Sequence, residues 1–159
     1  MTHDTAEALA LGSRTVVLEA GGIVHDGRPD EIARRPRSSY AAALVGVNVF
    51  QGTARNGTVT LSNGFELYTA SAATGPVTAI VNPRAVGLFE ERPTGTPRNV
   101  LETVVEGLDV EERRARVRLR GPVPLIAEVT PSAVDDLGIS PGRRFWIAIK
   151  ATEIDVRGR

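Results

Sequence analysis

The sequence predicts a mainly β protein. From residue 46 onward, short runs of β-branched and aliphatic residues recur, separated by Asn-Gly, Asn-Pro and Pro-Gly dipeptides that mark turns. Short strands at this spacing favour a small closed β-barrel. Apolar residues make up 42% of the chain and aromatic residues only 4%. The core is therefore expected to consist of Val, Leu, Ile and Ala.

The first 46 residues have a different pattern. A strand is expected over 15–19, and the Gly21-Gly22 dipeptide turns it into a second strand over 23–25, which predicts a hairpin. Three short helices are also expected, one after Asp4 or Thr5, one over 29–35 and one over 40–45. These elements are too small to close a core by themselves.

The rest of the chain is expected to be strands and turns. Asn56-Gly57 and Asn63-Gly64 are typical of hairpin turns. No internal repeat is apparent in the sequence. A short helix over 131–137 is expected to be capped by Thr130. The expected strands cover residues 49–54, 58–61, 65–69, 77–81, 85–89, 99–105, 115–119, 124–130, 145–150 and 153–156.

Composition argues against several functions. The 19 basic and 19 acidic residues balance, so there is no global field to attract nucleic acid or anionic lipid. There are no cysteines and only two histidines, which leaves little for a metal site or a thiol nucleophile. Gly21-Gly22 is not followed by the residues of a phosphate-binding loop. We therefore expect no complete enzyme, and the polar start and short apolar runs predict a cytoplasmic protein.

Four arginines, Arg114, Arg116, Arg118 and Arg120, alternate along one expected strand and share one of its faces. One interpretation is a stripe that binds nucleic acid or a membrane. The other is a solvated outer face with the intervening apolar residues packed inside. Neutral net charge and the lack of interleaved aromatic residues favour the outer face.

The single lysine, Lys150, ends an apolar strand and is followed by a hydroxyl residue. Two upstream segments also combine basic, amide or hydroxyl side chains, which are hydrogen-bond donors. Brought together, these segments predict a pocket for a small, permanently charged oxyanion; the alternative is that Lys150 is a solvated strand-end residue. The candidate ligands are Thr96, Arg98, Asn99, Thr130, Ser132, Lys150 and Thr152.

Residues 2–18 and 21–48, which include Gly21-Gly22-Ile23-Val24 and Gly27-Arg28-Pro29-Asp30-Glu31-Ile32, resemble the end of the nucleotide-binding domain of ABC transporter ATPases. In that resemblance His3 matches the switch histidine, which in the family contacts the ATP γ-phosphate. The family's phosphate loop, signature motif and magnesium-binding strand all precede this point. The resemblance therefore implies the C-terminal part of an importer ATPase, with residues 1–46 as a small α/β remnant and no catalytic residue of its own.

Residues 47–157 resemble the accessory barrel of such importers, and residues 94–157 are similar to the molybdate-binding domain of the TOBE/Mop type. The segments that carry this resemblance are Thr96-Pro97-Arg98-Asn99-Val100-Leu101, Val129-Thr130-Pro131-Ser132-Ala133, Leu137-Gly138-Ile139-Ser140-Pro141-Gly142 and Ile149-Lys150-Ala151-Thr152. The resemblance implies an OB-fold-like barrel that binds molybdate or tungstate and needs no cofactor or metal. It also implies a site shared between subunits, hence a homodimer or higher oligomer. Its other implications are contact with importer membrane subunits at the inner face of the cell membrane and no nucleic-acid partner.

Three positions depart from the family pattern. Thr96 replaces a serine but keeps a hydroxyl, whereas Thr103 replaces a glycine and Ala133 replaces a serine. The last two departures favour an alternative function, a dimerising or regulatory barrel without a ligand. A third alternative is an ATPase that is completed only in a longer chain.

Overall fold

The computed structural model describes residues 14–19, 21–28, 31–32 and 46–158. By internal contacts the chain divides into two compact units, Met1–Val49 and Phe50–Arg159. In the first unit β1 (Thr15–Glu19) and β2 (Gly22–Gly27) form an antiparallel hairpin, which confirms that prediction. Of the three expected helices only Glu31 and Ile32, both helical, fall within the described residues.

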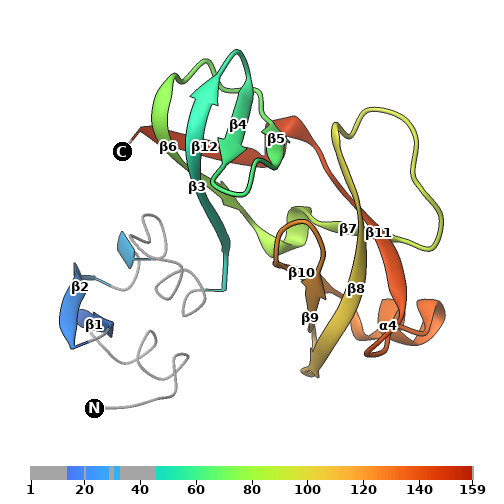
Figure 1. The fold of residues 1–159 in the computed structure, drawn as a ribbon. Helices are drawn as coiled ribbons and strands as arrows, with labels where there is room; N and C mark the ends of the chain where they lie inside the picture. The colour runs from blue at the N-terminus through green and yellow to red at the C-terminus, as the bar shows by residue number, and fades with distance from the viewer. Residues whose placement is uncertain (1–13, 20, 29–30, 33–45, 159) are drawn as a thin grey trace. The chain divides into compact units, whose positions relative to one another are not determined.

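The first five-stranded sheet of the second unit has the order β12-β6-β3-β4-β5 (Figure 1). The pairings of β12 with β6, of β3 with β4 and of β4 with β5 are all antiparallel. The sheet combines strands from the start and the very end of this unit. These strands are β3 (Asn48–Arg55), β4 (Thr58–Leu61), β5 (Glu66–Tyr68), β6 (Gly75–Val81) and β12 (Ile154–Gly158).

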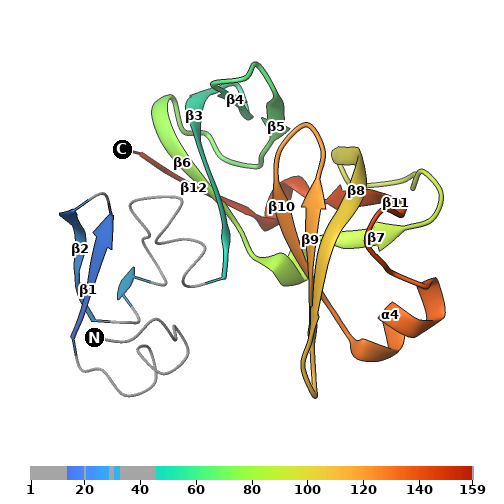
Figure 2. The same cartoon turned by 60° about the horizontal axis from the view of Figure 1, so that its bottom comes forward.

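The second sheet has the order β10-β9-β8-β11-β7. Figure 2 shows the long β8–β9 hairpin with β10 beside it and helix α4 (Pro131–Leu137) after β10. Two short 3₁₀ turns, η1 (Pro83–Ala85) and η2 (Ala151–Glu153), follow β6 and β11. The strands are β7 (Gly87–Phe89), β8 (Asn99–Val110), β9 (Ala115–Arg120), β10 (Leu125–Val129) and β11 (Arg144–Ile149).

The mainly β class and the order of the elements are confirmed. Asn56 and Gly57 both have positive φ, 51° and 77°, as a two-residue hairpin turn between right-twisted strands requires. Helix α4 has the expected bounds, and the Thr130 side chain accepts the capping bond from Ala133 N. The sequence did not predict how the strands pair with one another. The ten strands of the barrel divide between two five-stranded sheets.

The two sheets have the same plan, which corrects the prediction that the chain has no internal repeat. Strands β3 to β7 correspond in order to β8 to β12, because both sets run hairpin, strand, strand, 3₁₀ turn, strand. The last strand of each set joins the other set's sheet: β7 pairs with β11, and β12 pairs with β6. The repeat is not apparent in the sequence, because corresponding residues share little identity. They share only the alternation of apolar positions and an Asn-Val pair, Asn48-Val49 in the first half and Asn99-Val100 in the second.

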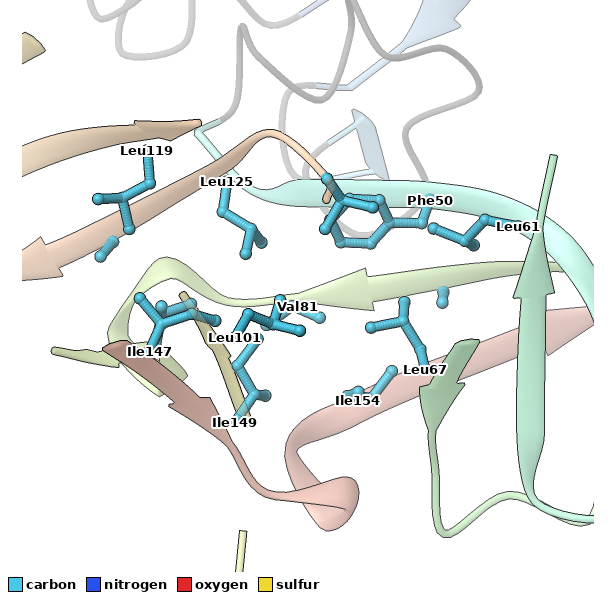
Figure 3. Close-up of a cluster of buried hydrophobic side chains, with 14 of the residues drawn as sticks. Phe50, Leu61, Leu67, Val81, Leu101, Leu119, Leu125, Ile147, Ile149 and Ile154 are labelled. Atoms are coloured by element: carbon cyan, nitrogen blue, oxygen red, sulfur yellow. The ribbon is translucent and has the colours of Figure 1, made fainter. Parts of the chain in front are cut away.

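Figure 3 shows that the inner faces of both sheets contribute to one apolar cluster. Phe50, Leu61 and Leu67 of the first sheet and Leu119, Leu125 and Ile147 of the second belong to the same set of buried side chains. The core rests on aliphatic residues, as composition predicted. Its continuity follows from the exchange of β7 and β12, since each strand carries the chain from one sheet to the other (Figure 1).

Close approach of two strands explains one departure from the family pattern. Thr103 follows Asn99 by four residues on β8, as Gly52 follows Asn48 on β3. A Cβ on Gly52 would lie 2.5 Å from the backbone oxygen of Thr60. On β8 the threonine is accommodated because Gly121 leaves room. A Cβ on Gly121 would lie 3.1 Å from Thr103 Cγ2. Thr103 is therefore a packing residue of the fold.

We expect Gly52→Ala to destabilise the chain by about 1–3 kcal/mol, because the added methyl must displace strand backbone. Urea unfolding followed by circular dichroism measures the change. Gly158→Ala is the control, since a Cβ at Gly158 has no heavy atom within 4 Å. Equal unfolding free energies for both variants would show that the strands separate without cost.

Candidate functional site

Two of the three predicted ligand segments leave the second sheet at the same end. Asn99, the first residue of β8, is registered opposite Ile149, the last residue of β11. The strands are antiparallel, so the residues before β8 and after β11 emerge together. The structure thus brings residues 96–98 close to residues 150–152, although about fifty residues separate them in sequence.

The residues of these segments line three hollows rather than one: the two described next, and a third that Arg98 and Asn99 share with Glu66 and Tyr68, among others. The Lys150 hollow is formed by Lys150, Pro97, Asn82, Arg84, Phe89 and Glu153, among others. The Arg98 hollow is lined by Arg98, Asn56, Gly57, Thr58, Tyr68, Thr69 and Ala151. The two predicted cationic ligands therefore lie in different hollows. Thr96 is an exposed residue of the loop before β8, and Thr152 is an exposed residue of η2.

The cations at this end of the sheet differ in their electrostatic surroundings. Arg98 and Lys150 are both exposed. In the described part of the chain neither lies within ion-pair distance of a carboxylate, so both charges are available to a ligand. Arg84, by contrast, has its Nε 2.9 Å from Glu128 Oε1. Its charge is largely compensated before any ligand arrives.

The side chain of Asn99 serves the fold, and its assignment as a ligand stays a prediction. The residue is 3% exposed. Its Oδ1 accepts from Tyr68 N at 2.8 Å, and its Nδ2 donates to Tyr68 O at 2.9 Å and to Ile149 O at 3.3 Å. The amide therefore joins the end of β5 to β8 and β11. Buried amides need such partners, and these two bonds use both protons of Nδ2.

Thr130 and Ser132 lie at the start of α4 and line neither the Lys150 hollow nor the Arg98 hollow. Thr130 Oγ1 accepts from Ala133 N at 3.2 Å and lies 3.0 Å from Ser132 Oγ. Only one of the two hydroxyl protons can be used between them. The pair retains one donor, but within one chain the structure does not bring it together with Arg98 or Lys150 in either hollow.

The alternating arginines form the expected outer face of β9. Ala115, Val117 and Leu119 are buried at 0–1% exposure. Each arginine has an acidic neighbour: Arg114 lies near Glu111 and Glu128, Arg116 near Glu128, Arg118 near Asp109 and Arg120 near Glu106. The hydrogen bond from Arg114 lowers the pKa of Glu111 from its ordinary value. The face is a mixed-charge surface, not a row of unpaired cations.

Three residues near the site were not singled out from sequence. Thr58 and Thr69 line the Arg98 hollow, and Arg84 lines the Lys150 hollow. The signal for Thr69 was weak, because only its place after a short strand distinguishes it from other threonines. Arg84 occupies the turn η1 that corresponds to η2, so only recognition of the repeat would have pointed to it.

The structure bears less directly on the predictions about the switch histidine, metal binding and membrane spans. His3, the match to the switch histidine, lies outside the described residues. Among the residues that the structure describes, no group of three or more His, Asp or Glu side chains is placed to hold a metal ion. No helix in the described ranges has the length and apolar character needed to cross a membrane.

Comparison with known proteins relates the chain to importer ATPases. Residues 95–156 match the TOBE domain. The molybdenum import ATP-binding protein ModC of Mycobacterium tuberculosis (strain ATCC 25618 / H37Rv) is 32% identical over 162 residues, which cover 96% of this chain and 44% of ModC. The molybdate/tungstate import ATP-binding protein WtpC of Pyrococcus abyssi is 30% identical over 158 residues, covering 98% of this chain and 46% of WtpC. The chain spans a little under half the length of these curated relatives.

A solved structure has the same fold. The cytoplasmic molybdate-binding protein ModG, in a form with molybdate bound, superimposes with a TM-score of 0.61 at 26% identity. The match covers 70% of this chain and 96% of ModG. This likeness and the relatives above confirm the TOBE/Mop-type resemblance and the expected OB-fold-like class.

The role of Asn99 is testable. We expect Asn99→Ala to lower the free energy of unfolding by about 2 kcal/mol or more, because it removes the partner of the part-buried Tyr68 N and O and of the buried Ile149 O. Chemical unfolding of the purified variant measures the loss. Gln51→Ala, an exposed substitution on β3, is the control and should change stability by no more than about 0.5 kcal/mol. A stable Asn99→Ala variant with impaired anion binding would identify Asn99 as a ligand.

Proposed function

We propose that the chain is the oxyanion-binding, regulatory part of an ABC importer ATPase, because its residues 95–156 match the TOBE domain. Molybdate or tungstate is the proposed ligand. Residues 1–46 are proposed to be the end of the nucleotide-binding domain, and residues 47–157 the regulatory barrel. In this role the chain acts in the cytoplasm at the inner face of the membrane, bound through the whole ATPase to the importer's membrane subunits.

One observation carries this proposal most strongly. Two loops of a TOBE/Mop-type barrel emerge at one end of the second sheet, and each brings a cation without a carboxylate partner in the described residues, Arg98 in one and Lys150 in the other. A tetrahedral dianion needs only hydrogen-bond donors and positive charge. Arginine offers a planar fork and lysine a point charge. No residue is required to perform chemistry, so binding can act as a signal.

The proposed regulation follows from linkage. An anion that binds the folded barrel, but not its unfolded chain, stabilises the barrel and any subunit arrangement that the bound state prefers. Changes in intracellular oxyanion concentration would then alter the state of the importer. The names of ModC, WtpC and ModG support the choice of molybdate or tungstate over other anions.

A second function is favoured by particular residues. Asn99 and Thr103 are committed to the fold, with Thr103 Oγ1 donating to Phe145 O at 3.0 Å. Arg98 and Lys150 also line different hollows. These features fit a barrel that dimerises without a ligand. A chain that is dimeric in light scattering and gives no heat with molybdate would support this function over oxyanion binding.

We expect Arg98→Ala to weaken molybdate binding about 10- to 150-fold, as the loss of one charge-assisted hydrogen bond predicts. Lys150→Ala should weaken binding to the same extent if both cations contact one anion, and should leave it unchanged if the anion lies in the Arg98 hollow alone. Isothermal titration at fixed salt measures the dissociation constant, with sulfate as the competing anion. Both residues are exposed, so stability should hardly change.

Arg113→Ala is the matched control, because Arg113 is also an exposed cation without a described carboxylate partner. It should bind molybdate like the parent chain. If Arg98→Ala and Lys150→Ala are folded and also bind like the parent, the assignment of these cations fails and the dimerising function becomes the better one.

We also expect no ATP hydrolysis by the chain alone. A phosphoryl-transfer site needs a backbone cradle and a lysine on the phosphates, and this sequence contains neither motif. A coupled phosphate-release assay on the purified chain checks this. Turnover that copurifies with the chain and disappears on His3→Ala would contradict it.

A further inference from the structure

The Arg98 hollow combines parts of both sheets. We propose that one chain completes an oxyanion pocket by itself, with Arg98 supplying the charge and Thr58 and Thr69 supplying hydroxyls. These two threonines take the part that the sequence assigned to Thr130 and Ser132. The inference rests on the proposed function and names the residues and the stoichiometry of its site.

Arg98 is held beside the end of β5 by its neighbour. The Asn99 amide makes hydrogen bonds to both Tyr68 N and Tyr68 O, at 2.8 and 2.9 Å. Because these bonds fix the chain direction at the start of β8, Arg98 lies next to the residue after β5, Thr69. Both residues line the same hollow. The backbone at Arg98 is therefore held beside Thr69 by the hydrogen bonds of the Asn99 amide to the Tyr68 backbone.

Thr69 is held in turn by the β3–β4 hairpin. Thr69 N donates to Gly57 O at 2.7 Å. Thr69 Oγ1 donates to the same oxygen over 3.4 Å and accepts from Ser71 N over 3.3 Å. A bond of 3.4 Å is near the limit for a hydroxyl, so its proton can turn to a stronger, charged acceptor at little cost.

The lining of the Arg98 hollow favours an anion. Thr58 is paired with Tyr68 across β4 and β5 and adds a second hydroxyl, and the remaining lining residues, Asn56, Gly57, Tyr68 and Ala151, include no carboxylate. The Lys150 hollow, by contrast, contains Glu153, and Arg84 there is paired with Glu128. Of these two hollows, only the Arg98 hollow holds a cation with no carboxylate in its lining.

The repeat does not provide an equivalent second pocket. The residue before β8 is Arg98, whereas the residue before β3 is Val47. The residue after β11 is Lys150, whereas the residue after β6 is Asn82. In the first half of the repeat, the positions that correspond to Arg98 and Lys150 therefore carry no cation. We therefore expect one oxyanion per chain, bound whether or not chains associate.

Titration of hydroxyl variants with molybdate tests the pocket. We expect one anion per chain for the parent and an affinity about 10-fold or more weaker for Thr69→Val, because a donor to a charged acceptor is removed. Thr69→Ser should retain most of the affinity. Ser132→Ala should bind like the parent, as should Thr60→Val, an exposed threonine on the same strand as Thr58. Thermal unfolding of each variant confirms that it is folded.

The outcomes distinguish a failure of the intrachain pocket from a failure of the proposed function. If the parent binds but Thr69→Val matches it, or if Ser132→Ala loses 10-fold or more, the intrachain pocket is refuted and a site shared between subunits replaces it. A stoichiometry of two anions per chain also refutes it. If the folded parent binds no molybdate or tungstate, the proposed function itself fails, and the pocket fails with it.

Discussion

The exchange of β7 and β12 between the sheets is the constraint on which the rest of this barrel unit depends. Each sheet ends in a strand supplied by the other half, through pairings of β7 with β11 and β12 with β6. Neither half can complete its sheet alone, so the two must fold together. The exchange also makes the core continuous from Leu67 to Ile147 (Figure 3), and it covers strand edges that would otherwise be open to pairing with other chains.

The same exchange determines where function can reside. The turns η1 and η2 are the crossings between sheets, and each is followed by an exchanged strand. Loops from opposite halves therefore meet at these crossings. Ala151 of η2 accepts a bond from Ala70 N at 3.2 Å, which joins the second crossing to the segment after β5. A pocket at this place draws its charge from one half and its hydroxyls from the other.

Polar residues of similar type have quite different roles in this chain. Asn99 and Thr130 were predicted ligands and Thr103 a departure from the family pattern, yet the side chain of each bonds to backbone: Asn99 to Tyr68 and Ile149, Thr103 to Phe145, and Thr130 to Ala133. Burial decides the roles of Asn99 and Thr103, because a buried polar group must be satisfied by the fold. Arg98 and Lys150 are exposed and have no such partner in the described structure, which leaves them for recognition.

The sequence by itself determined the local features of this protein. The Asn56-Gly57 turn, the bounds of α4 with its Thr130 cap and the outward face of Arg116 and Arg118 depend on interactions within a few residues, and residue type encodes them. Only the tertiary structure decided which strands share a sheet, that β7 and β12 are exchanged and that Asn99 binds Tyr68. The physical reason is distance along the chain. The bonds of Asn99 span 31 and 50 residues, and among many apolar strands of similar length the choice of partner rests on packing of the whole core.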